Sequence, residues 1–419
     1  MTRDASRMKN ALWGLFIGDA LAMPAHWFYS LDNLKKAFGN GKGVTEYHDA
    51  PHPHPDSFMV GMGYEPDVEK AKSLGRPYDI LQSGNKKFYE TTYSKLEIER
   101  NEREGEHGNA APSLENRFHY HHGMKAGENT LAAQLARVLM RSVVKKGFYD
   151  EKTFLEDFVS FMTEPGRNND AYSEIYVRRW FENYSRGVDM RDCGAHQRDI
   201  WSIGSMGGMI RPLVLSLIAP NPFQATGVAC THQVLTHRSE NVSSALAVTV
   251  PLLHNLIRKC DTKEVWTTTA NFIHLPKISG EGLFEKYRDA EGPGNIPSKE
   301  MWKLHTELED EPWQFSSYVL KESEKDVVRT KIANACYPEH GLPLGLFLAA
   351  KHRYNFRDAL LANANAGGDN VHRGCMLGIL LGAAQDDIPK DLKEGLLAFK
   401  ELEIEIDAFV EVALKANVV

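Results

Sequence analysis

The chain has 419 residues and a formal net charge of −7, with 42% hydrophobic and 25% charged residues. This composition is typical of a folded globular protein with a sizeable core. The excess of acidic groups excludes the basic surface on which nucleic-acid binding depends, so we expect no nucleic-acid partner.

The amino-terminal segment "MTRDASRMKNALWGLFIGDALAMP" has the basic start and the apolar stretch of a signal peptide, but Asp19 interrupts that stretch. A folded amphipathic helix explains the segment better. The five cysteines are scattered and include no CxxC pair, which predicts neither a disulfide framework nor a structural zinc site. We therefore expect a cytoplasmic protein without a membrane partner, and its oligomeric state stays open.

Apolar residues recur at intervals of three and four along most of the chain, which is the pattern of amphipathic helices. The clearest examples are residues 8–27, 130–147, 149–164, 171–187, 239–260 and 396–416. Strand-like alternation of useful length is almost absent. The sequence predicts an all-α fold, with residues 1–419 forming a single compact domain of many helices.

Two long excursions interrupt this pattern, at about residues 40–125 and 275–325. The first combines the Pro- and His-rich "HDAPHPHPD" with the charged run "KKFYETTYSKLEIERNEREGEHG", and the second contains "SGEGLFEKYRDAEGPGNIPSKEMW". Such compositions are typical of long loops, and we expect at most short helices inside the first one.

Glycine recurs at intervals of four in two of the predicted helices. Gly14 and Gly18 are followed by Ala22 in the first, and Gly374, Gly378 and Gly382 follow one another in the last glycine-rich one. Because each glycine costs a helix about 1 kcal/mol relative to alanine, a stripe of them needs compensation. Close packing of two helix backbones supplies it, and we predict that these two helices face each other. Packing of the glycines against bulky side chains elsewhere is the alternative.

The segment "NANAGGDNVHRG", residues 363–374, places an unusual set of polar groups at the start of the second glycine-striped helix. Asp369 is suited to the N-cap or first turn, and His372 lies three residues later on the same face. A cap explains Asp369 alone but leaves Asn370, His372 and Arg373 unexplained. We therefore predict a functional site where the two glycine-striped helices meet.

Three motifs in this order resemble those of the ADP-ribosylglycohydrolase family: "ALWGLFIGDALAMP", "AGENTLAAQLARVLMRSVVKKG" and "NANAGGDNVHRGCMLGILLGA". Together they extend over most of the chain. The resemblance implies an all-helical, single-domain fold. It also implies cleavage of ADP-ribose from an acceptor, generally with two Mg or Mn ions held by the second and third motifs. "PAHWFY" together with "GGDNVHRG" resembles the branch that contains the J-type lens crystallins and selenoprotein J.

The motifs depart from the family pattern where the metal ions would bind. His26 stands where the family has a glutamate, and Glu128 and Asn129 replace two aspartates. In the third motif Asp369 is kept, whereas Val371 and His372 replace an aspartate and a threonine. Hard cations prefer several carboxylate oxygens. With Glu128 and Asp369 as the remaining carboxylate ligands, we expect at most one divalent ion, Mg or Mn, or none.

The leading hypothesis is a hydrolase that cleaves a glycosidic or C–N bond of a small polar substrate. A carboxylate would activate water while an imidazole supplies or accepts the proton. The predicted catalytic residues are Glu128, Asp369, His26 and His372. The predicted substrate-binding residues are Asp19, Asn129, Asp170, Asn370, Arg373, His122 and His237.

Each of these residues also has a structural interpretation. His26 and His237 suit a hydrogen-bonded core, and Asp170 suits the cap of the helix that follows it. The rival hypothesis is accordingly a non-catalytic, crystallin-like structural or ligand-binding protein that keeps the fold with a degenerate site.

Overall fold

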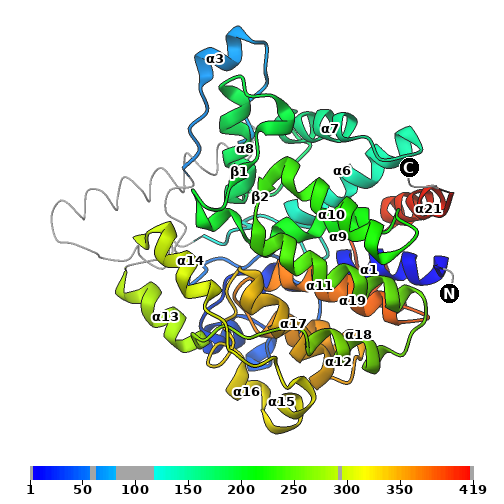
Figure 1. The fold of residues 1–419 in the computed structure, drawn as a ribbon. Coiled ribbons are helices and arrows are strands. Elements are labelled where there is room, and N and C mark those ends of the chain that lie inside the picture. Colours follow the sequence, from blue (N-terminus) through cyan, green and yellow to red (C-terminus); the bar gives the residue numbers. More distant parts are fainter. Residues whose placement is uncertain (1–2, 57–62, 82–117, 291–294, 416–419) are drawn as a thin grey trace.

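The computed structural model describes residues 3–56, 63–81, 118–290 and 295–415 (Figure 1). The first half contains the helices α1 (Ala5–Ala22), η1 (Met23–Ala25), α2 (Leu31–Ala37), η2 (Gly39–Gly41), α3 (Val68–Ser73), α6 (Leu131–Lys146), α7 (Glu151–Thr163), α8 (Ile175–Ser185) and η5 (Met190–Asp192). It continues through β1 (Ala195–His196), η6 (Trp201–Ile203), η7 (Met206–Met209), α9 (Ile210–Ser216), α10 (Pro222–Thr236) and β2 (His237–Arg238).

The remaining elements are also helical: α11 (Glu240–Ile257), α12 (Thr262–Ala270), α13 (Gly280–Asp289), α14 (Ser298–Thr306), α15 (Phe315–Lys321), α16 (Glu324–Val327), α17 (Pro338–Lys351), α18 (Phe356–Asn365), α19 (Asn370–Ala384), α20 (Lys390–Glu394) and α21 (Phe399–Lys415). The two short strands pair in parallel, Ala195 with His237 and His196 with Arg238. The predicted all-α class is confirmed.

Helices α1 and α19 run antiparallel with their backbones in direct contact, near the middle of the molecule (Figure 1). A Cβ atom added to Gly14 would lie 2.0 Å from the carbonyl oxygen of Gly378, and one added to Gly18 would lie 2.1 Å from that of Gly374. A Cβ on Gly382 would similarly lie 2.1 Å from the carbonyl oxygen of Asn10. The predicted contact between the two glycine stripes is therefore confirmed.

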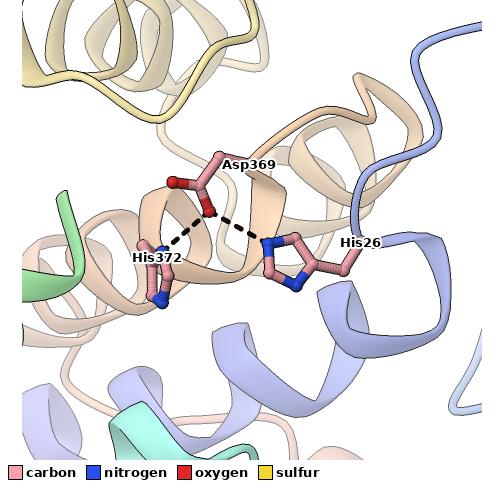
Figure 2. Close-up of side chains that lie close together, drawn as sticks. All are labelled: His26, Asp369 and His372. Carbon is pink, nitrogen blue, oxygen red and sulfur yellow. Dashed lines mark hydrogen bonds and ion pairs between the residues drawn. The ribbon is translucent and has the colours of Figure 1, made fainter. Parts of the chain in front are cut away.

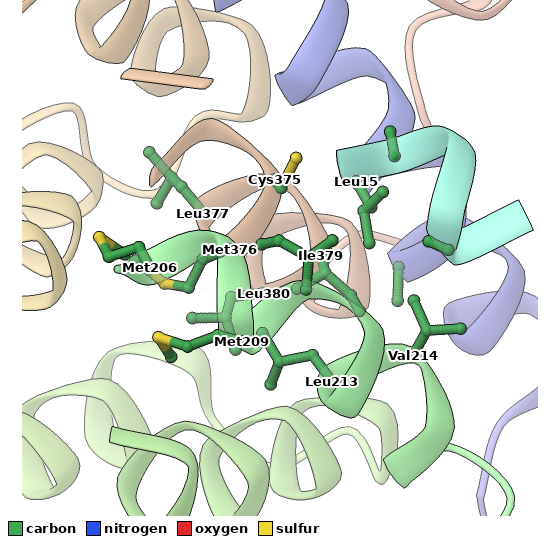
Figure 3. Packing of buried hydrophobic residues seen from close by; sticks show 14 of the residues in the cluster. Leu15, Met206, Met209, Leu213, Val214, Cys375, Met376, Leu377, Ile379 and Leu380 are labelled. Atoms are coloured by element: carbon green, nitrogen blue, oxygen red, sulfur yellow. The ribbon is translucent and has the colours of Figure 1, made fainter. Parts of the chain in front are cut away.

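Helix α19 is the most enclosed part of the core, and every residue from Asn370 to Ala383 is buried. One face meets the α1 backbone, and Figure 3 shows other α19 side chains beside those of η7 and α9. These side chains include Cys375, Met376, Leu377, Ile379 and Leu380 of α19, and Met206, Met209, Leu213 and Val214 of η7 and α9. The same cluster of buried side chains extends from Met8 to Ala413.

The two predicted excursions have different outcomes. In the first, the described part contains only the short helices η2 and α3, and residues 57–62 and 82–117 lie outside the described residues. The second is largely helical, with α13, α14 and α15 between residues 280 and 321. The expected loop at 275–325 is therefore corrected, because glycine and proline between short amphipathic helices obscured their periodicity. Among the described residues, no helix is long and apolar enough to cross a membrane.

The contact between α1 and α19 leads to a direct prediction for Gly378→Ala. The new methyl group would overlap the Gly14 carbonyl, so the two helices must separate. We expect the free energy of unfolding to fall by about 3 kcal/mol, although alanine favours an isolated helix. Urea denaturation measures the change.

Gly227→Ala is the matched control, because Gly227 lies inside α10 and a Cβ there would meet nothing within 4 Å. This variant should gain up to about 1 kcal/mol from helix propensity. Equal stability changes in the two variants would contradict the close helix contact.

Candidate functional site

Asp369 lies between two histidines where α1 and α19 meet (Figure 2). His26, in the segment after η1, places Nε2 3.1 Å from Asp369 Oδ1. His372, in the first turn of α19, places Nδ1 2.8 Å from the same oxygen. The second contact is an ion pair without hydrogen-bond geometry, since His372 Nδ1 has no hydrogen-bond partner. All three side chains are buried.

A tight backbone turn holds Asp369 in this position. Gly367 and Gly368 have φ values of +59° and +62°, in the region that favours glycine. A Cβ on Gly368 would lie 1.9 Å from the carbonyl oxygen of Asn334. The Gly368 amide donates to the Phe28 carbonyl at 2.8 Å, and the Trp27 amide donates to the Gly368 carbonyl at 2.7 Å. The turn therefore connects the His26 segment directly to the start of α19.

Asp369 occupies the N-cap position of α19 but does not cap it, because its side chain accepts no backbone N–H group there. The capping interpretation of this carboxylate is therefore wrong. One of its oxygens faces the two imidazoles, and the other, Oδ2, is buried without a hydrogen-bond partner. The carboxylate is thus held for interaction with the histidines and not for the helix terminus.

The contacts continue beyond His26 through a buried series of polar groups. His26 Nδ1 lies 2.7 Å from His121 Nε2, and His121 Nδ1 lies 2.8 Å from Asp170 Oδ1. At the other end, His372 Nε2 lies 3.6 Å from Glu174 Oε2, and the Ser205 hydroxyl donates to Glu174 Oε1 at 2.6 Å. Imidazoles and carboxylates thus form one connected series from Asp170 to Glu174.

The charges of the three central groups are set by burial and by one another. Burial lowers the pKa of His26 to about 3, so this imidazole is neutral at physiological pH. Burial alone would also lower the pKa of His372, but the carboxylates of Asp369 and Glu174 raise it to about 10. Burial would raise the pKa of Asp369, but His372 and His26 hold it below its ordinary value. The result is a neutral His26 beside an ion pair of Asp369 and His372.

The amino terminus of α6 anchors two of the predicted acids. Asp19 Oδ2 accepts from the Thr130 amide at 2.8 Å and from Asn129 Nδ2 at 2.9 Å. Asp170 Oδ2 accepts from the Leu131 amide at 2.7 Å. Both carboxylates thus lie at the positive end of the helix dipole. The expected capping of its own helix by Asp170 is wrong, because α8 begins only at Ile175.

A narrow pocket opens beside this series, with a cavity volume of about 10 Å³. Its polar walls come from His121, Thr130, Asp170, Glu174 and His372, and the remaining walls are aromatic and aliphatic. A small polar group in this pocket would meet the outer edge of His372 and the Glu174 carboxylate together. The pocket is therefore the place where the buried series can reach a ligand.

Several predicted residues lie elsewhere or have structural partners. Glu128 is half-buried and accepts from the Lys125 amide at 2.8 Å and from Asn169 Nδ2. Arg373 is buried and donates to Asn363 Oδ1 at 2.7 Å and to the Gly367 carbonyl at 2.8 Å. These contacts of Arg373 support the glycine turn.

Three other predicted substrate-binding residues also contact the protein itself. Asn370 Nδ2 donates to the Ala364 carbonyl at 2.9 Å. The ring of His122 packs against Phe118, with centroids 4.9 Å apart. His237 is buried, and its ring lies 4.7 Å from that of Tyr176.

Sequence reasoning did not place His121 or Glu174 among the site residues, although both belong to the series. His121 is adjacent to His122, and the pattern "HYHH" contained a usable signal. His119 and His121 are two residues apart, and both are buried beside the His26 segment. Glu174 lacked such a signal, because a glutamate at a helix start is ordinarily interpreted as a dipole-stabilising residue.

The donor atoms of His26, Asp369 and His372 lie close enough together to hold a metal ion. His26, Asp369 and His372 each offer one ligand atom, and these atoms lie within 4.8 Å of one another. The unpaired Asp369 Oδ2 and His372 Nδ1 are compatible with a cation there. Glu128 is outside this group, so the described residues do not place it with Asp369 as a ligand pair. Two imidazoles and one carboxylate fit a single first-row transition ion better than Mg²⁺.

An all-helical fold with a polar centre between two glycine-striped helices defines a particular class of protein. A family model described as ADP-ribosylglycohydrolase matches residues 1–417, and the chain belongs to this family. The family is named for hydrolases. A solved structure titled "ADP-ribosylglycohydrolase-related protein complex" is similar with a TM-score of 0.53 and 16% identity over 98% of both chains, which supports the fold. No curated protein matches the chain.

The raised pKa of His372 predicts a pH dependence of stability in the metal-free protein. Its pKa is 6.5 in an unfolded chain and about 10 in the fold. The stabilisation is therefore complete below pH 6.5 and disappears as the pH rises toward 10. We expect a loss of about 5 kcal/mol as an upper bound.

Urea denaturation with chelator present, compared between the native protein and His372→Gln, isolates this contribution. The difference in the free energy of unfolding should shrink as the pH rises from 6.5 to 10. A difference that stays constant over this interval would show that His372 is not held in its charged form.

Proposed function

We propose that this chain hydrolyses a glycosidic or C–N bond of a small polar substrate, and that it does so in the cytoplasm without a nucleic-acid or membrane partner. The observation that carries the proposal is the position of His372 between two carboxylates at the edge of the pocket. Its Nδ1 faces Asp369 at 2.8 Å, and its Nε2 faces Glu174 at 3.6 Å. A protonated imidazole and an ionised carboxylate then meet the same bound molecule.

In the proposed reaction, water attacks the carbon at the scissile bond and gives a proton to the Glu174 carboxylate. The bond to the leaving group breaks, and His372 Nε2 donates its proton to that leaving group. The proton on Glu174 then returns to His372, which restores both groups. Asp369 stabilises the imidazolium throughout, because it stays beside Nδ1.

The carboxylates predicted from the sequence take other roles in this scheme. Asp369 is enclosed between two histidines and acts on His372, so it is a positioning residue in the proposal. His26 holds Asp369 from the opposite side. Burial raises the pKa of Glu128, and the charge of nearby Asp170 raises it further. We propose that Glu128 contributes to the electrostatics of the pocket entrance.

A single metal ion is compatible with the same centre. We propose that His26, Asp369 and His372 would hold it. The expectation of Mg from the sequence rested instead on the carboxylate oxygens of Glu128 and Asp369. When bound, such an ion would act as a Lewis acid and activate water. Binding requires the proton on His372 Nδ1 to leave, so metal affinity should rise with pH.

The catalytic proposal predicts loss of turnover in Glu174→Gln and His372→Gln. Each variant removes one side of the proton exchange, and we expect kcat to fall by about 100-fold or more. The assay is a screen of N- and O-glycosides, ADP-ribosylated compounds included, with the native protein and both variants. Glu403→Gln, an exposed change on α21, is the matched control and should keep full turnover.

Turnover that survives unchanged in Glu174→Gln would eliminate the proposed water activation. If the native protein hydrolyses no glycosidic or C–N bond, the proposed reaction class is eliminated.

The metal proposal predicts at most one bound ion per chain and a preference for Mn²⁺, Co²⁺ or Zn²⁺ over Mg²⁺. Elemental analysis after dialysis gives the stoichiometry, and calorimetric titration gives the order of affinity. His26→Ala should weaken binding strongly, whereas His122→Ala, on a ring that packs against Phe118, should not. Two tightly held ions per chain would contradict the donor set.

The rival proposal is a non-catalytic, crystallin-like protein with a degenerate site. The structural contacts of Asp19, Asn370 and Arg373 favour it, because these residues are bonded to the protein itself. The two proposals differ in the screen described above. A bound ligand without turnover supports the rival, and turnover that Glu174→Gln abolishes excludes it.

A further inference from the structure

A second polar cluster lies at the amino terminus of α17, apart from the series between Asp170 and Glu174. We call it the Glu339 cluster, and its members are Trp201, Tyr287, His305, Tyr337, Glu339 and His340. The His305 ring stacks on Trp201 at 5.0 Å and meets Tyr337 at 4.7 Å and His340 at 5.8 Å. The Tyr287 hydroxyl lies 3.2 Å from His305 Nε2. Elements η6, α13, α14 and α17 thus contribute to one aromatic cluster.

Buried polar atoms without a hydrogen-bond partner gather in this cluster. Both carboxylate oxygens of Glu339 are unpaired, as are Trp201 Nε1, His305 Nδ1 and His340 Nε2. His340 Nδ1 accepts from the Ala333 amide at 3.1 Å, so its neutral ring carries the proton at Nε2. Two N–H donors and a carboxylate therefore point away from protein partners. Such groups normally bond to water or to a ligand.

Glu339 is the most costly of these groups to leave unpaired. Burial raises its pKa to about 8, and no positively charged side chain among the described residues offsets the effect. Burial and the nearby Cys336 are the larger causes of the raised pKa values of Tyr287 and Tyr337, and the charge of Glu339 raises both values further. The carboxylate therefore lies close to two aromatic rings and lacks a cation. An incoming cation would stabilise its ionised form.

The cluster adjoins the proposed catalytic centre through residues 334–337. The carbonyl of Asn334 accepts from the Asp369 amide at 2.9 Å, and the carbonyl of Cys336 accepts from the Met206 amide at 2.8 Å. Burial and the charges of Asp369, Glu174 and Glu339 all raise the pKa of the Cys336 thiol. Cys336 is therefore located between the two groups of carboxylates. Glu339 and Tyr287 keep partial solvent exposure, whereas the carboxylate oxygens of Glu339 are themselves buried.

We propose that the Glu339 cluster is a binding site for a small molecule that carries an ammonium group next to a hydroxyl or carbonyl oxygen. The ammonium group donates to the Glu339 carboxylate and lies against the rings of Tyr287 and Tyr337. The neighbouring oxygen accepts from Trp201 Nε1 or His340 Nε2. The Glu339 carboxylate and one of the two N–H donors then gain a partner. The site is independent of hydrolysis and remains if the proposed reaction is wrong.

Ethanolamine is the smallest probe with this chemistry, and ethylene glycol is its neutral counterpart. Calorimetric or ligand-observed NMR titration of the full chain should show saturable binding of ethanolamine and none of ethylene glycol. Glu339→Gln keeps the shape and removes the charge, so it should weaken ethanolamine at least about tenfold. Trp201→Phe, which keeps an aromatic ring and removes a donor, should weaken it as well.

Glu285→Gln is the matched control, because Glu285 is exposed on the same helix as Tyr287. It should bind ethanolamine like the native protein. Thermal denaturation of each variant confirms that it is folded before binding is compared. Unchanged affinity in folded Glu339→Gln, equal binding of ethylene glycol, or absence of saturation in the native protein would each overturn the proposal. Turnover of glycosides is measured separately, so either result stands without the other.

Discussion

The backbone contact between α1 and α19 is the constraint on which the rest of the structure depends. Glycine at positions 14, 18, 374, 378 and 382 lets each helix approach the carbonyl groups of the other. No other residue type permits this approach, because a single Cβ would overlap those carbonyls. The contact determines the position of the carboxyl end of α1 relative to the amino end of α19. It therefore determines where the His26 segment meets the first turn of α19.

The polar centre follows from this arrangement. His26 and Asp369 are 343 positions apart in the chain, yet the Gly367–Gly368 turn brings them together in a region closed to water. Burial there would be unfavourable for any isolated charge. The structure instead places each acid of the series in contact with an imidazole. Low dielectric strengthens these contacts and separates the protonation states of His26 and His372.

Two imidazoles beside one carboxylate give this centre a different chemistry from that of a site built of oxygen ligands. A site rich in oxygen ligands favours hard divalent ions, whereas two imidazoles and one carboxylate can also hold and donate protons. The carboxylates that remain lie at both ends of the series, as Asp170 and Glu174. Glu339 adds a third acidic group nearby with no partner in the protein. The chain thus combines a buried centre whose charged groups contact one another with a neighbouring cluster in which the Glu339 carboxylate has no partner.

Much of the fold was predictable from the sequence, because helical periodicity and glycine spacing are local signals. They indicated the all-α class, the contact between the first and the last glycine-rich helix, and the convergence of His26 with Asp369 and His372. The actual role of each group depended on its tertiary neighbours. Asp369 does not cap its helix, Asp170 caps a different one, and Arg373 supports a turn. His121 joined the centre from the "HYHH" segment, and Glu174 joined it from a segment with no pattern of its own. Spacing along a chain specifies which residues share a helix face, whereas burial and hydrogen-bond partners, which set charge and reactivity, arise only when distant segments pack.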